Sequence, residues 1–408
     1  MMRTDERVDH TKASASHSSQ GHAVKPLLPG STIGVLGGGQ LGRMMALAGI
    51  AMGYRFVTLD PAEDAPCAQA AQHIRAPYDD LAAAEELAKR SDVITYEFEN
   101  VSLDVVQVLE RESYVPQGSR LLEATKHRLR EKGALTAAGI PVAPYAAIHS
   151  LEDLEQNLAA VGGQGVLKTC TGGYDGKGQF MIRRPEQAQE AYELLASTGA
   201  ELVLEAYIPF VKELSVIAAR NPDGEIATFP VAENIHHDHI LHLSIVPARI
   251  APEVIEEAER IAYRVAESLG VVGLIAVEMF LTADNEILVN ELAPRPHNSG
   301  HYTMDACRTS QFEQHVRAIC NLPLGDTTLM TPVVMVNLLG QHQEDMLQWL
   351  MEEDKIAQEL GVTPKLHDYG KSQALPKRKM GHINVLAADV ESALSWVNQI
   401  NMWRNQQQ

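Results

Sequence analysis

A glycine-rich segment at residues 171–178, Thr-Gly-Gly-Tyr-Asp-Gly-Lys-Gly, has the composition of a phosphate-binding loop. Its four glycines allow backbone amides to approach an anion closely, and Lys168 and Lys177 add positive charge. The segment lacks the Gly-Lys-Ser/Thr ending of a Walker A loop, and no helix is expected directly after it. The alternative is an ordinary hairpin tip with solubilising lysines. The density of glycines favours a mobile lid over the phosphates of ATP.

Two carboxylates are predicted to face each other across a hairpin. With a two-residue turn at 284–285, Glu278 lies directly opposite Glu291, whereas a four-residue loop would leave the two as diagonal neighbours. Opposed carboxylates repel each other, and Mg²⁺ bound by one or two carboxylates and substrate phosphates relieves that repulsion. Asn290 would add a neutral ligand or a ribose contact if the strand twists there. The alternative, Glu291 facing solvent, is weakened by the polar residues that follow at 293–298.

A second glycine pattern, GGGQLG at 37–42, falls between a predicted strand at 32–36 and a helix that Gly53 ends. With Asp60 at the end of the next strand, it satisfies the dinucleotide fingerprint, in which amides at a helix N-terminus bind a pyrophosphate. A nicotinamide-dependent oxidoreductase is one interpretation of this loop. The other is that the glycines only let strand and helix pack closely, and the loop alone does not decide between them.

These motifs are carried by the elements of an α/β protein. Strand and helix alternate up to about residue 96, which predicts a parallel sheet covered by helices. The segment 115–125 is expected to be a linker into a small α+β unit that carries the glycine-rich segment, and a larger α+β unit carries the hairpin. The predicted boundaries are 1–29 for a disordered polar leader, 30–125 for an N-terminal Rossmann-like domain, 126–204 for a lid subdomain, 205–345 for a second subdomain, and 346–408 for a C-terminal extension with a basic loop.

Composition excludes several classes of partner. The chain has 408 residues and a formal net charge of −19, so neither nucleic acid nor an anionic membrane is expected, since both require basic surface. No apolar run is long enough to span a bilayer. The cysteines have no CxxC or zinc-like spacing, and with no secretory signal in view they indicate a reducing, cytoplasmic environment. These cysteines are Cys67, Cys170, Cys307 and Cys320.

Five motifs in a fixed order carry a resemblance to a known family. They are GGGQLGRMM (37–45), TYEFENV (95–101), TGGYDGKGQ (171–179), ENIHHDHIL (233–241) and NELAPRPHNSGHYT (290–303). With Lys168, Glu278 and the segment 205–208, these motifs make the chain resemble the 5-(carboxyamino)imidazole ribonucleotide synthase family of the ATP-grasp superfamily. The resemblance runs from about Thr32 to a basic loop near the C-terminus, and it implies an ATP-grasp architecture.

The resemblance also implies a reaction in de novo purine (IMP) biosynthesis. ATP would phosphorylate bicarbonate to carboxyphosphate, and 5-aminoimidazole ribonucleotide would be carboxylated to 5-(carboxyamino)imidazole ribonucleotide, with ADP and phosphate released. ATP and Mg²⁺ are the implied cofactors, and a homodimer acting on small molecules is the implied assembly. Another ATP-grasp carboxylase or ligase is the alternative within the superfamily. An NAD-binding oxidoreductase or a catalytically silent nucleotide-binding protein is the alternative outside it.

Site residues follow from the resemblance at matching positions. Lys168, Arg295 and His297 would be catalytic, and the last two would hold bicarbonate or carboxyphosphate through charge-assisted bonds. Glu278 and Glu291 would bind Mg²⁺. Gln40 and its neighbouring amides would face the imidazole ribonucleotide. The ATP site would comprise Arg128, Lys168, Gly173, Tyr174, Asp175, Gly176, Lys177, Gly178, Gln179, Glu205, Ala206, Tyr207, Ile208, Glu213, His236, Asn290 and Glu291, with 205–208 at the adenine and Glu213 at the ribose. The ribonucleotide site would comprise Gln40, Glu97, Tyr174, Asp175, Arg295, Lys371 and Arg378.

The basic loop departs from the family's usual form. The segments 369–371 and 378–382 are kept, whereas the residues between them differ and Lys377 directly precedes the second segment. Lys371, Lys377 and Arg378 are therefore three candidates for contact with the ribonucleotide phosphate. A solvated basic loop is the alternative, since that is the usual role of such a run.

Overall fold

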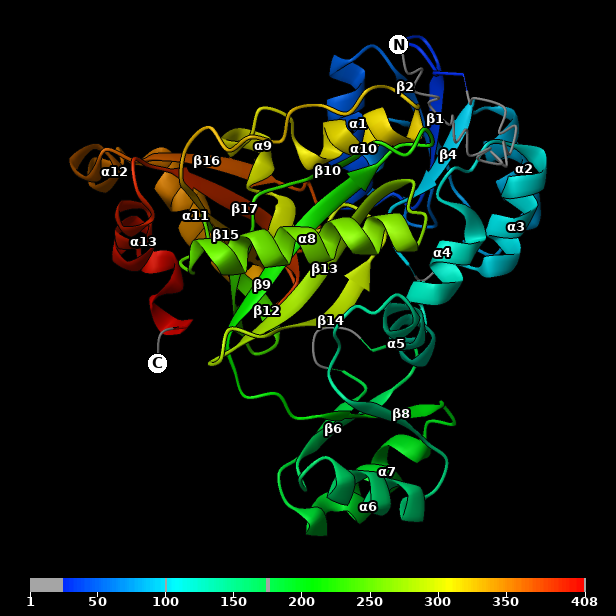
Figure 1. Ribbon diagram of the computed structural model, residues 1–408. Coiled ribbons are helices and arrows are strands. Elements are labelled where there is room, and N and C mark those ends of the chain that lie inside the picture. The colour runs from blue at the N-terminus through cyan, green and yellow to red at the C-terminus, as the bar shows by residue number, and fades with distance from the viewer. Residues whose placement is uncertain (1–24, 100, 174–176, 407–408) are drawn as a thin grey trace, which may run out of the picture.

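The computed structural model describes residues 25–99, 101–173 and 177–406. The first 24 residues of the predicted leader lie outside these ranges. Figure 1 shows three parts: a parallel sheet near the N-terminus, a long central sheet crossed by one helix, and a small sheet below with two helices beneath it. The predicted α/β architecture of three units is confirmed. The exact boundaries between the units stay a prediction.

The N-terminal unit is a four-stranded parallel sheet in the order β3-β2-β1-β4. The strands β1, β2 and β4 are largely buried, since helices cover each side of the sheet, and this explains why they are mostly apolar, whereas the short edge strand β3 is only partly buried. The prediction of a linker at 115–125 is wrong in part. Residues 118–125 form a helix, and its Leu122 is buried in the core of this unit. The elements are β1 (Thr32–Leu36), α1 (Gln40–Ala51), β2 (Arg55–Leu59), β3 (Gln72–Ile74), α2 (Leu81–Lys89), β4 (Val93–Tyr96), α3 (Leu103–Glu112) and α4 (Gly118–Thr125).

The small unit is a four-stranded antiparallel sheet in the order β5-β8-β6-β7. Two helices, α6 and α7, cover one face, where Leu154 and Leu195 pack against Leu167 and Leu204 of the strands. Strand β6 leads into the glycine-rich segment. The elements are α5 (Arg128–Ala137), β5 (Tyr145–Ile148), α6 (Leu151–Ala160), β6 (Gly165–Thr169), β7 (Gln179–Ile182), α7 (Ala188–Ala196) and β8 (Leu202–Ala206).

The third unit is a nine-stranded sheet in the order β14-β13-β9-β11-β12-β15-β17-β16, with β10 paired to β9. Every pair of neighbouring strands in this sheet is antiparallel within the described residues. The last strands of the chain thus continue the sheet that contains the hairpin. The strands are β9 (Phe210–Arg220), β10 (Ile226–Thr228), β11 (Ala232–His237), β12 (Ile240–Val246), β13 (Gly273–Thr282), β14 (Ile287–Ala293), β15 (Val333–Leu339), β16 (Thr363–Asp368) and β17 (Lys379–Leu386).

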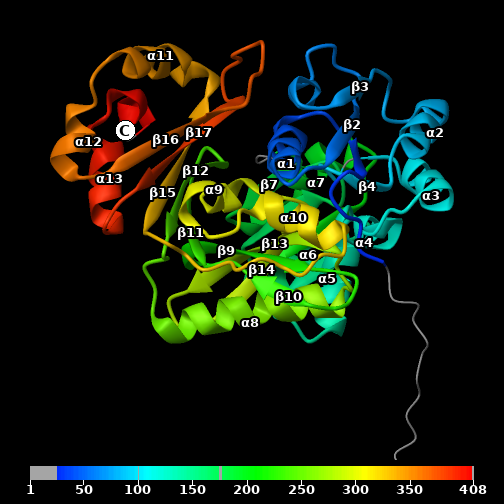
Figure 2. The ribbon, with the colours of Figure 1, turned by 90° about the horizontal axis from the view of Figure 1, so that it is seen from above.

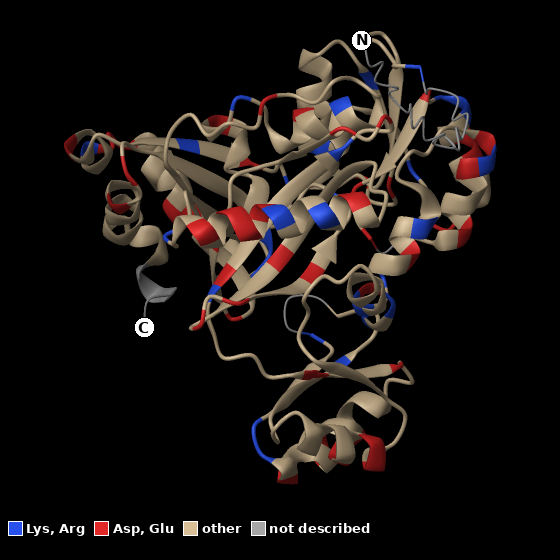
Figure 3. Cartoon of the chain, in the orientation of Figure 1, with Lys and Arg blue, Asp and Glu red and all other residues tan. Residues whose placement is uncertain are grey.

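Helices cover the central sheet on both faces. Helix α8 packs Ile261 and Val265 on one face, and acidic and basic residues follow each other along its exposed side (Figure 3). Helix α10 lies on the other side, between the sheet and α1 of the N-terminal unit (Figure 2), where Phe312 and Val316 join that unit's core. The helices are α8 (Pro252–Ser268), α9 (Thr303–Ala306), α10 (Gln311–Ile319), α11 (Gln343–Met351), α12 (Lys355–Leu360) and α13 (Val390–Gln399).

The loop between β16 and β17 joins the C-terminal strands to the N-terminal unit. Arg43 of α1 donates to the carbonyl oxygen of Asp368 at 3.1 Å, and Gln69 donates to that of Gly370 at 3.0 Å. Ser372 donates to the carboxylate of Asp64. Residues some 300 positions apart in the chain therefore meet at one edge of the N-terminal sheet. Within the described ranges, no helix has both the length and the apolar character needed to cross a membrane.

Candidate active site

The predicted opposition of Glu278 and Glu291 is confirmed, but a different turn produces it. The two residues are register partners in the pairing of β13 with β14. The hairpin closes through a bond from the Thr282 amide to the Glu286 carbonyl, so the two-residue turn is wrong. The register nearer the turn is displaced by one residue, and a bulge that leaves Asn290 without a register partner restores the opposition.

The carboxylate pair is electrostatically costly. Burial, and then the charge of Glu291, raises the pKa of Glu278 to about 7. His297 approaches Glu278 at 3.1 Å through Nε2, and Arg128 approaches Glu291 at 3.4 Å. The side-chain oxygen of Asn290 is buried and has no hydrogen-bond partner among the described residues. Two carboxylates and one unpartnered amide oxygen are hard oxygen donors, and this donor set suits Mg²⁺.

A buried cluster of cations lies beside this pair. Lys168 Nζ contacts Glu205 Oε2 at 2.9 Å, and Lys132 Nζ contacts Glu205 Oε1 at 3.5 Å. Burial alone would raise the pKa of Glu205, but Lys168 and Lys132 outweigh it and hold that pKa below its usual range. The Glu205 carboxylate is therefore occupied by two lysines. Any contact of this residue with an adenine ring would use its backbone.

One cleft brings together several of the residues predicted to bind ATP. It lies between the glycine-rich segment and the hairpin, and a phosphate chain placed there would meet both backbone amides and fixed charges. Its lining includes Gly173, Arg128 and Glu291, all predicted, and Glu99, Lys126 and Glu131, which were not. Some of the residues predicted to bind the phosphates of ATP thus line one cleft, and their role in ATP binding stays a prediction.

The residues predicted at the sugar and base lie along β8, β9 and β11. Glu213 Oε2 and His236 Nδ1 are 2.6 Å apart. Burial lowers the pKa of His236, but the Glu213 carboxylate has the larger combined effect and raises it above its usual value. Ala206 donates its amide to the carbonyl of Pro144, and Tyr207 is exposed in the connection that follows.

Arg295 and His297 follow β14 and lie next to the carboxylate pair. Arg295 makes a two-pronged ion pair with Glu99, with contacts of 2.5 Å and 3.2 Å. Burial, followed by the charge of Arg295, lowers the pKa of His297 well below its usual range. His297 is therefore a neutral imidazole near pH 7, with Nδ1 bonded to Ser299 at 2.9 Å and Nε2 directed at Glu278.

Three amides of the first glycine loop are bonded to carboxylates of the chain itself. Glu97 accepts hydrogen bonds from the amides of Gly39 and Gly42, the latter at 2.5 Å. Asp60 accepts from the Gly38 amide at 2.7 Å. The expectation that the amides beside Gln40 face the ribonucleotide is wrong for these three, and so is the pyrophosphate site of the nicotinamide interpretation, because carboxylates of the chain itself occupy them.

Burial explains the state of Glu97. It raises the pKa of this carboxyl to about 7, although the two amide bonds act in the opposite direction. Glycine at 37 and 39 permits the close approach, since a Cβ at either position would stand within 2.7 Å of a Glu97 side-chain atom. The glycines here serve the packing of a carboxylate.

Two of the three candidate cations of the basic loop donate to carbonyls of the C-terminal unit itself, and one of these bonds runs from Arg378 Nη1 to the Gln373 carbonyl at 2.9 Å. Lys371 Nζ donates to the carbonyl of Lys379 at 2.6 Å, and burial, followed by the charges of Arg378 and Lys379, lowers its pKa to about 8. The charge of Glu97 acts on the same pKa in the opposite direction and is the smallest of these effects. Lys377 instead pairs with Asp238 at 3.1 Å on an exposed surface.

Comparisons with known proteins agree with this geometry. Residues 30–125 match the ribonucleotide synthetase preATP-grasp domain, residues 133–312 the ATP-grasp domain, and residues 333–395 the phosphoribosylaminoimidazole carboxylase C-terminal domain. The N5-carboxyaminoimidazole ribonucleotide synthase of Bacillus subtilis (strain 168) is 49% identical over 381 residues, which are 93% of this chain and 97% of that protein. The chain belongs to the N5-carboxyaminoimidazole ribonucleotide synthase family.

Solved structures of the family are similar throughout. An N5-carboxyaminoimidazole ribonucleotide synthetase in complex with ADP has 53% identity and a TM-score of 0.89, covering 94% of this chain and 99% of that one. The Aspergillus clavatus N5-carboxyaminoimidazole synthase in complex with ADP and 5-aminoimidazole ribonucleotide has 30% identity and a TM-score of 0.82, covering 91% and 97%. The predicted ATP-grasp fold is confirmed.

Some predicted residues are placed only in part. Tyr174, Asp175 and Gly176 lie outside the described residues. Gly178 accepts a bond from the Thr169 amide, and Gln179 opens β7 opposite Lys168. The individual roles assigned through the N5-carboxyaminoimidazole ribonucleotide synthase family stay predictions.

Besides Glu99 and Lys126 of the cleft, two buried residues of a helix were missed from the sequence. Lys132 and Glu131 are buried on α5, one turn after Arg128, and Glu131 accepts a bond from the Leu292 amide at 3.1 Å. Burial and the charge of Glu291 raise the pKa of Glu131 to about 8. The spacing Arg128-x-x-Glu131-Lys132 was the available signal, since residues three and four apart share one face once the segment is helical, as it is in α5.

Proposed function

We propose that this protein carboxylates 5-aminoimidazole ribonucleotide with bicarbonate and ATP, giving 5-(carboxyamino)imidazole ribonucleotide, ADP and phosphate in purine biosynthesis. The observation that carries the proposal is the contact between His297 and Glu278, because it joins the nucleotide side of the site to the loop that holds Arg295. The proposed sites for the ATP phosphates and for bicarbonate would then be adjacent at this contact. Membership of the family supports the choice of substrates.

On the nucleotide side, Arg128 and Lys168 would bind the phosphates of ATP, and the backbone of 171–173 would approach them from the lid. Glu278, Glu291 and Asn290 would hold Mg²⁺. When bound, this ion would neutralise phosphate charge. Lys132 would hold Glu205 in place, so that Lys168 keeps a fixed position.

At the centre, Arg295 and His297 would bind bicarbonate and then carboxyphosphate. Arg295 is buried and keeps its positive charge through its ion pair with Glu99, so it can orient an anion at this position. His297 is neutral, with Nδ1 held by Ser299 and Nε2 against Glu278, so a reacting oxygen that displaced the Glu278 contact could exchange a proton with Nε2. Transfer of the carboxyl group would then need the ribonucleotide amine within reach.

On the ribonucleotide side, Lys371 and Arg378 would bind the phosphate, and Glu97 and Gln40 would face the imidazole end. The charge of Glu97 acts in a small way on the pKa of Lys371, which supports placing both residues at the same substrate. Because Glu97 already accepts two amide bonds, it is held rigidly.

The test is phosphate release from ATP in mixtures that contain or lack bicarbonate and 5-aminoimidazole ribonucleotide. The proposal expects rapid release only in the complete mixture. Glycinamide ribonucleotide and biotin serve as alternative acceptors, and faster release with either would identify a different ATP-grasp ligase. Absence of release in the complete mixture would contradict the proposal.

We also propose a homodimer in the cytoplasm. All four cysteines are buried and unpaired, which suits a reducing compartment. Sedimentation of the purified chain tests the assembly, with a single species of twice the chain mass expected and a monomer contradicting it.

A further inference from the structure

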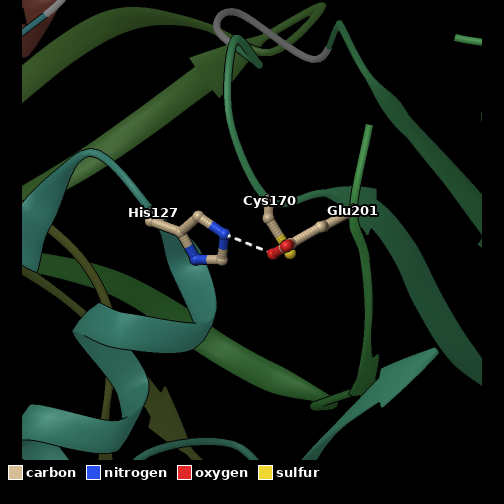
Figure 4. Close-up of side chains that lie close together, drawn as sticks. All are labelled: His127, Cys170 and Glu201. Carbon is tan, nitrogen blue, oxygen red and sulfur yellow. Dashed lines mark hydrogen bonds and ion pairs between the residues drawn. The ribbon is translucent and has the colours of Figure 1, made fainter. Parts of the chain in front are cut away.

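Three side chains capable of binding a metal lie together at the base of the glycine-rich segment (Figure 4). His127 precedes α5, Cys170 follows β6, and Glu201 precedes β8. Their ligand atoms lie within 4.8 Å of one another, and His127 Nε2 contacts Glu201 Oε2 at 2.7 Å. Together they offer one nitrogen, one sulfur and one oxygen.

The backbone holds these three residues in place. The Cys170 amide donates to the Glu201 carbonyl at 2.8 Å, and the next residue after His127, Arg128, donates its amide to the Cys170 carbonyl at 3.0 Å. Three segments that are distant in sequence are thus tied together by main-chain bonds. The main-chain positions from which the three side chains start are therefore fixed relative to one another.

The environment of each group fits a ligand better than an isolated ion pair. The Cys170 side chain is buried, and the Leu129 amide donates toward its sulfur, a contact that favours a thiolate. His127 Nδ1 is buried with no hydrogen-bond partner among the described residues. Glu201 is 73% exposed, so it forms the open side through which an ion can enter.

A simple His–Glu ion pair would leave the thiol unexplained. Burial, and then the Glu201 carboxylate, raises the pKa of the Cys170 thiol to about 11, so the thiol keeps its proton when no ion is bound. A bound cation would displace this proton and take the sulfur as a thiolate ligand. Mg²⁺ prefers oxygen ligands, whereas Zn²⁺ accepts nitrogen, sulfur and oxygen and commonly has three protein ligands and one water.

We propose that His127, Cys170 and Glu201 bind a divalent cation of the Zn²⁺ class, at a site separate from the Glu278–Glu291 pair. Cys170 directly precedes the glycine-rich segment and His127 directly precedes Arg128. A cation bound here therefore ties the base of the proposed lid to the start of α5.

The test uses Co²⁺ as a spectroscopic probe of the untagged full chain. One equivalent is expected to give the charge-transfer absorption of a cobalt–thiolate bond, and Zn²⁺ is expected to remove it by competition. Cys170→Ala abolishes the band, whereas Cys320→Ala, which removes another buried thiol, keeps it. Replacing residues that only hydrogen-bond to a metal ligand typically lowers metal affinity roughly 10–100-fold. Glu201→Gln and His127→Gln change ligands themselves, so each should weaken binding about tenfold or more.

Several results would overturn the proposal. A cobalt spectrum without a thiolate band would place the ion elsewhere, for example at His237 and His242, whose rings are neighbours. Displacement of the ion by excess Mg²⁺ would place it at the carboxylate pair. If Cys170→Ala fails to fold, Glu201→Gln decides, because its side chain is exposed: unchanged affinity and an unchanged rise of the thermal midpoint with Zn²⁺ would contradict the site.

Discussion

The two glycine-rich loops have similar compositions and opposite surroundings. In the loop at 37–42, carboxylates of the chain accept the amide bonds, with Glu97 bound by two amides and Asp60 by one. At the loop that begins at Thr171, the cleft is lined by Lys126 and Arg128 as well as by the carboxylates Glu99, Glu131 and Glu291. Carboxylates of the chain occupy amides of the first loop, whereas the second loop borders a cleft where we propose that the phosphates of ATP bind.

This difference shows what a glycine pattern does and does not predict. Glycine indicates that something approaches the backbone closely, and the neighbouring charges decide what approaches. In the first loop it is the side chain of Glu97, which a Cβ at Gly37 or Gly39 would obstruct. A fingerprint that fits strand, turn and helix therefore does not by itself establish a phosphate site.

The largest effect is expected from Glu291→Gln, which changes the carboxylate pair beside the second loop. We expect turnover to fall about a hundredfold or more, because charge placed at the reacting phosphate is lost. Without Mg²⁺ the thermal midpoint should not fall, since the repulsion with Glu278 is relieved. Steady-state rates and thermal unfolding check both outcomes. Glu286→Gln, on the exposed hairpin loop, is the control.

Wild-type activity in Glu291→Gln would remove the metal from this pair. A loss of activity equal to that of the Glu286→Gln control would point to the fold of the hairpin instead of its charges. Either result would weaken the contrast between the two loops, because the groups beside the second loop would then not bind a metal and nucleotide.

The next effect is expected from Lys168→Ala. A charge-assisted hydrogen bond contributes roughly 1.5–3 kcal/mol, so ADP binding should weaken about ten- to a hundredfold. Lys177→Ala should cost less, because that residue lies on the loop and loses more conformational entropy on binding. Calorimetric titration with ADP ranks the two variants. The opposite order would mean that the loop, not the strand beside it, supplies the fixed charge.

A smaller and more selective effect is expected from Arg378→Ala. The KM for 5-aminoimidazole ribonucleotide should rise about tenfold, with the KM for ATP nearly unchanged, and high salt should have the same effect. Lys377→Ala is the control and should be milder, since Lys377 pairs with Asp238 on an exposed surface. A shift in the KM for ATP alone would assign the basic loop to the other substrate.

The smallest effect is expected on stability, from Glu97→Gln in the closed loop. The pKa of Glu97 is raised from 4.5 to about 7, so the folded state binds its proton more tightly than the unfolded state does. Its stabilising contribution is complete below about 4.5 and is lost as pH rises toward 7. The thermal midpoint of Glu97→Gln should therefore fall less than that of the wild type between pH 4.5 and 7. Glu85→Gln on α2 is the control and should show the wild-type fall. An unchanged pH profile would mean that Glu97 is not buried as described.

The sequence predicted those features that rest on local pattern. The opposition of Glu278 and Glu291 follows from alternation along two strands. The turn differs from the expected one and displaces the register by one residue, and the bulge at Asn290 restores it. The helix α4 was missed because 115–125 reads as a polar connection, and only tertiary burial of Leu122 shows its packed face.

What the sequence could not predict depends on residues that meet from distant segments. The amides of the first loop are occupied by Glu97, which lies on a strand end 55 and 58 positions away. Glu99 pairs with Arg295 across 196 positions. No local spacing encodes such pairs, because they arise from sheet order and domain packing.

The most direct test of this account follows the carbon of bicarbonate. With bicarbonate carrying a labelled carbon, ATP and 5-aminoimidazole ribonucleotide, nuclear magnetic resonance should show the label in a new carbamate on the ribonucleotide, formed only when ATP is present. Lys168→Ala and Arg378→Ala should each slow its appearance, the first through ATP and the second through the ribonucleotide. Release of phosphate with no labelled carbamate, or labelling without ATP, would contradict the account.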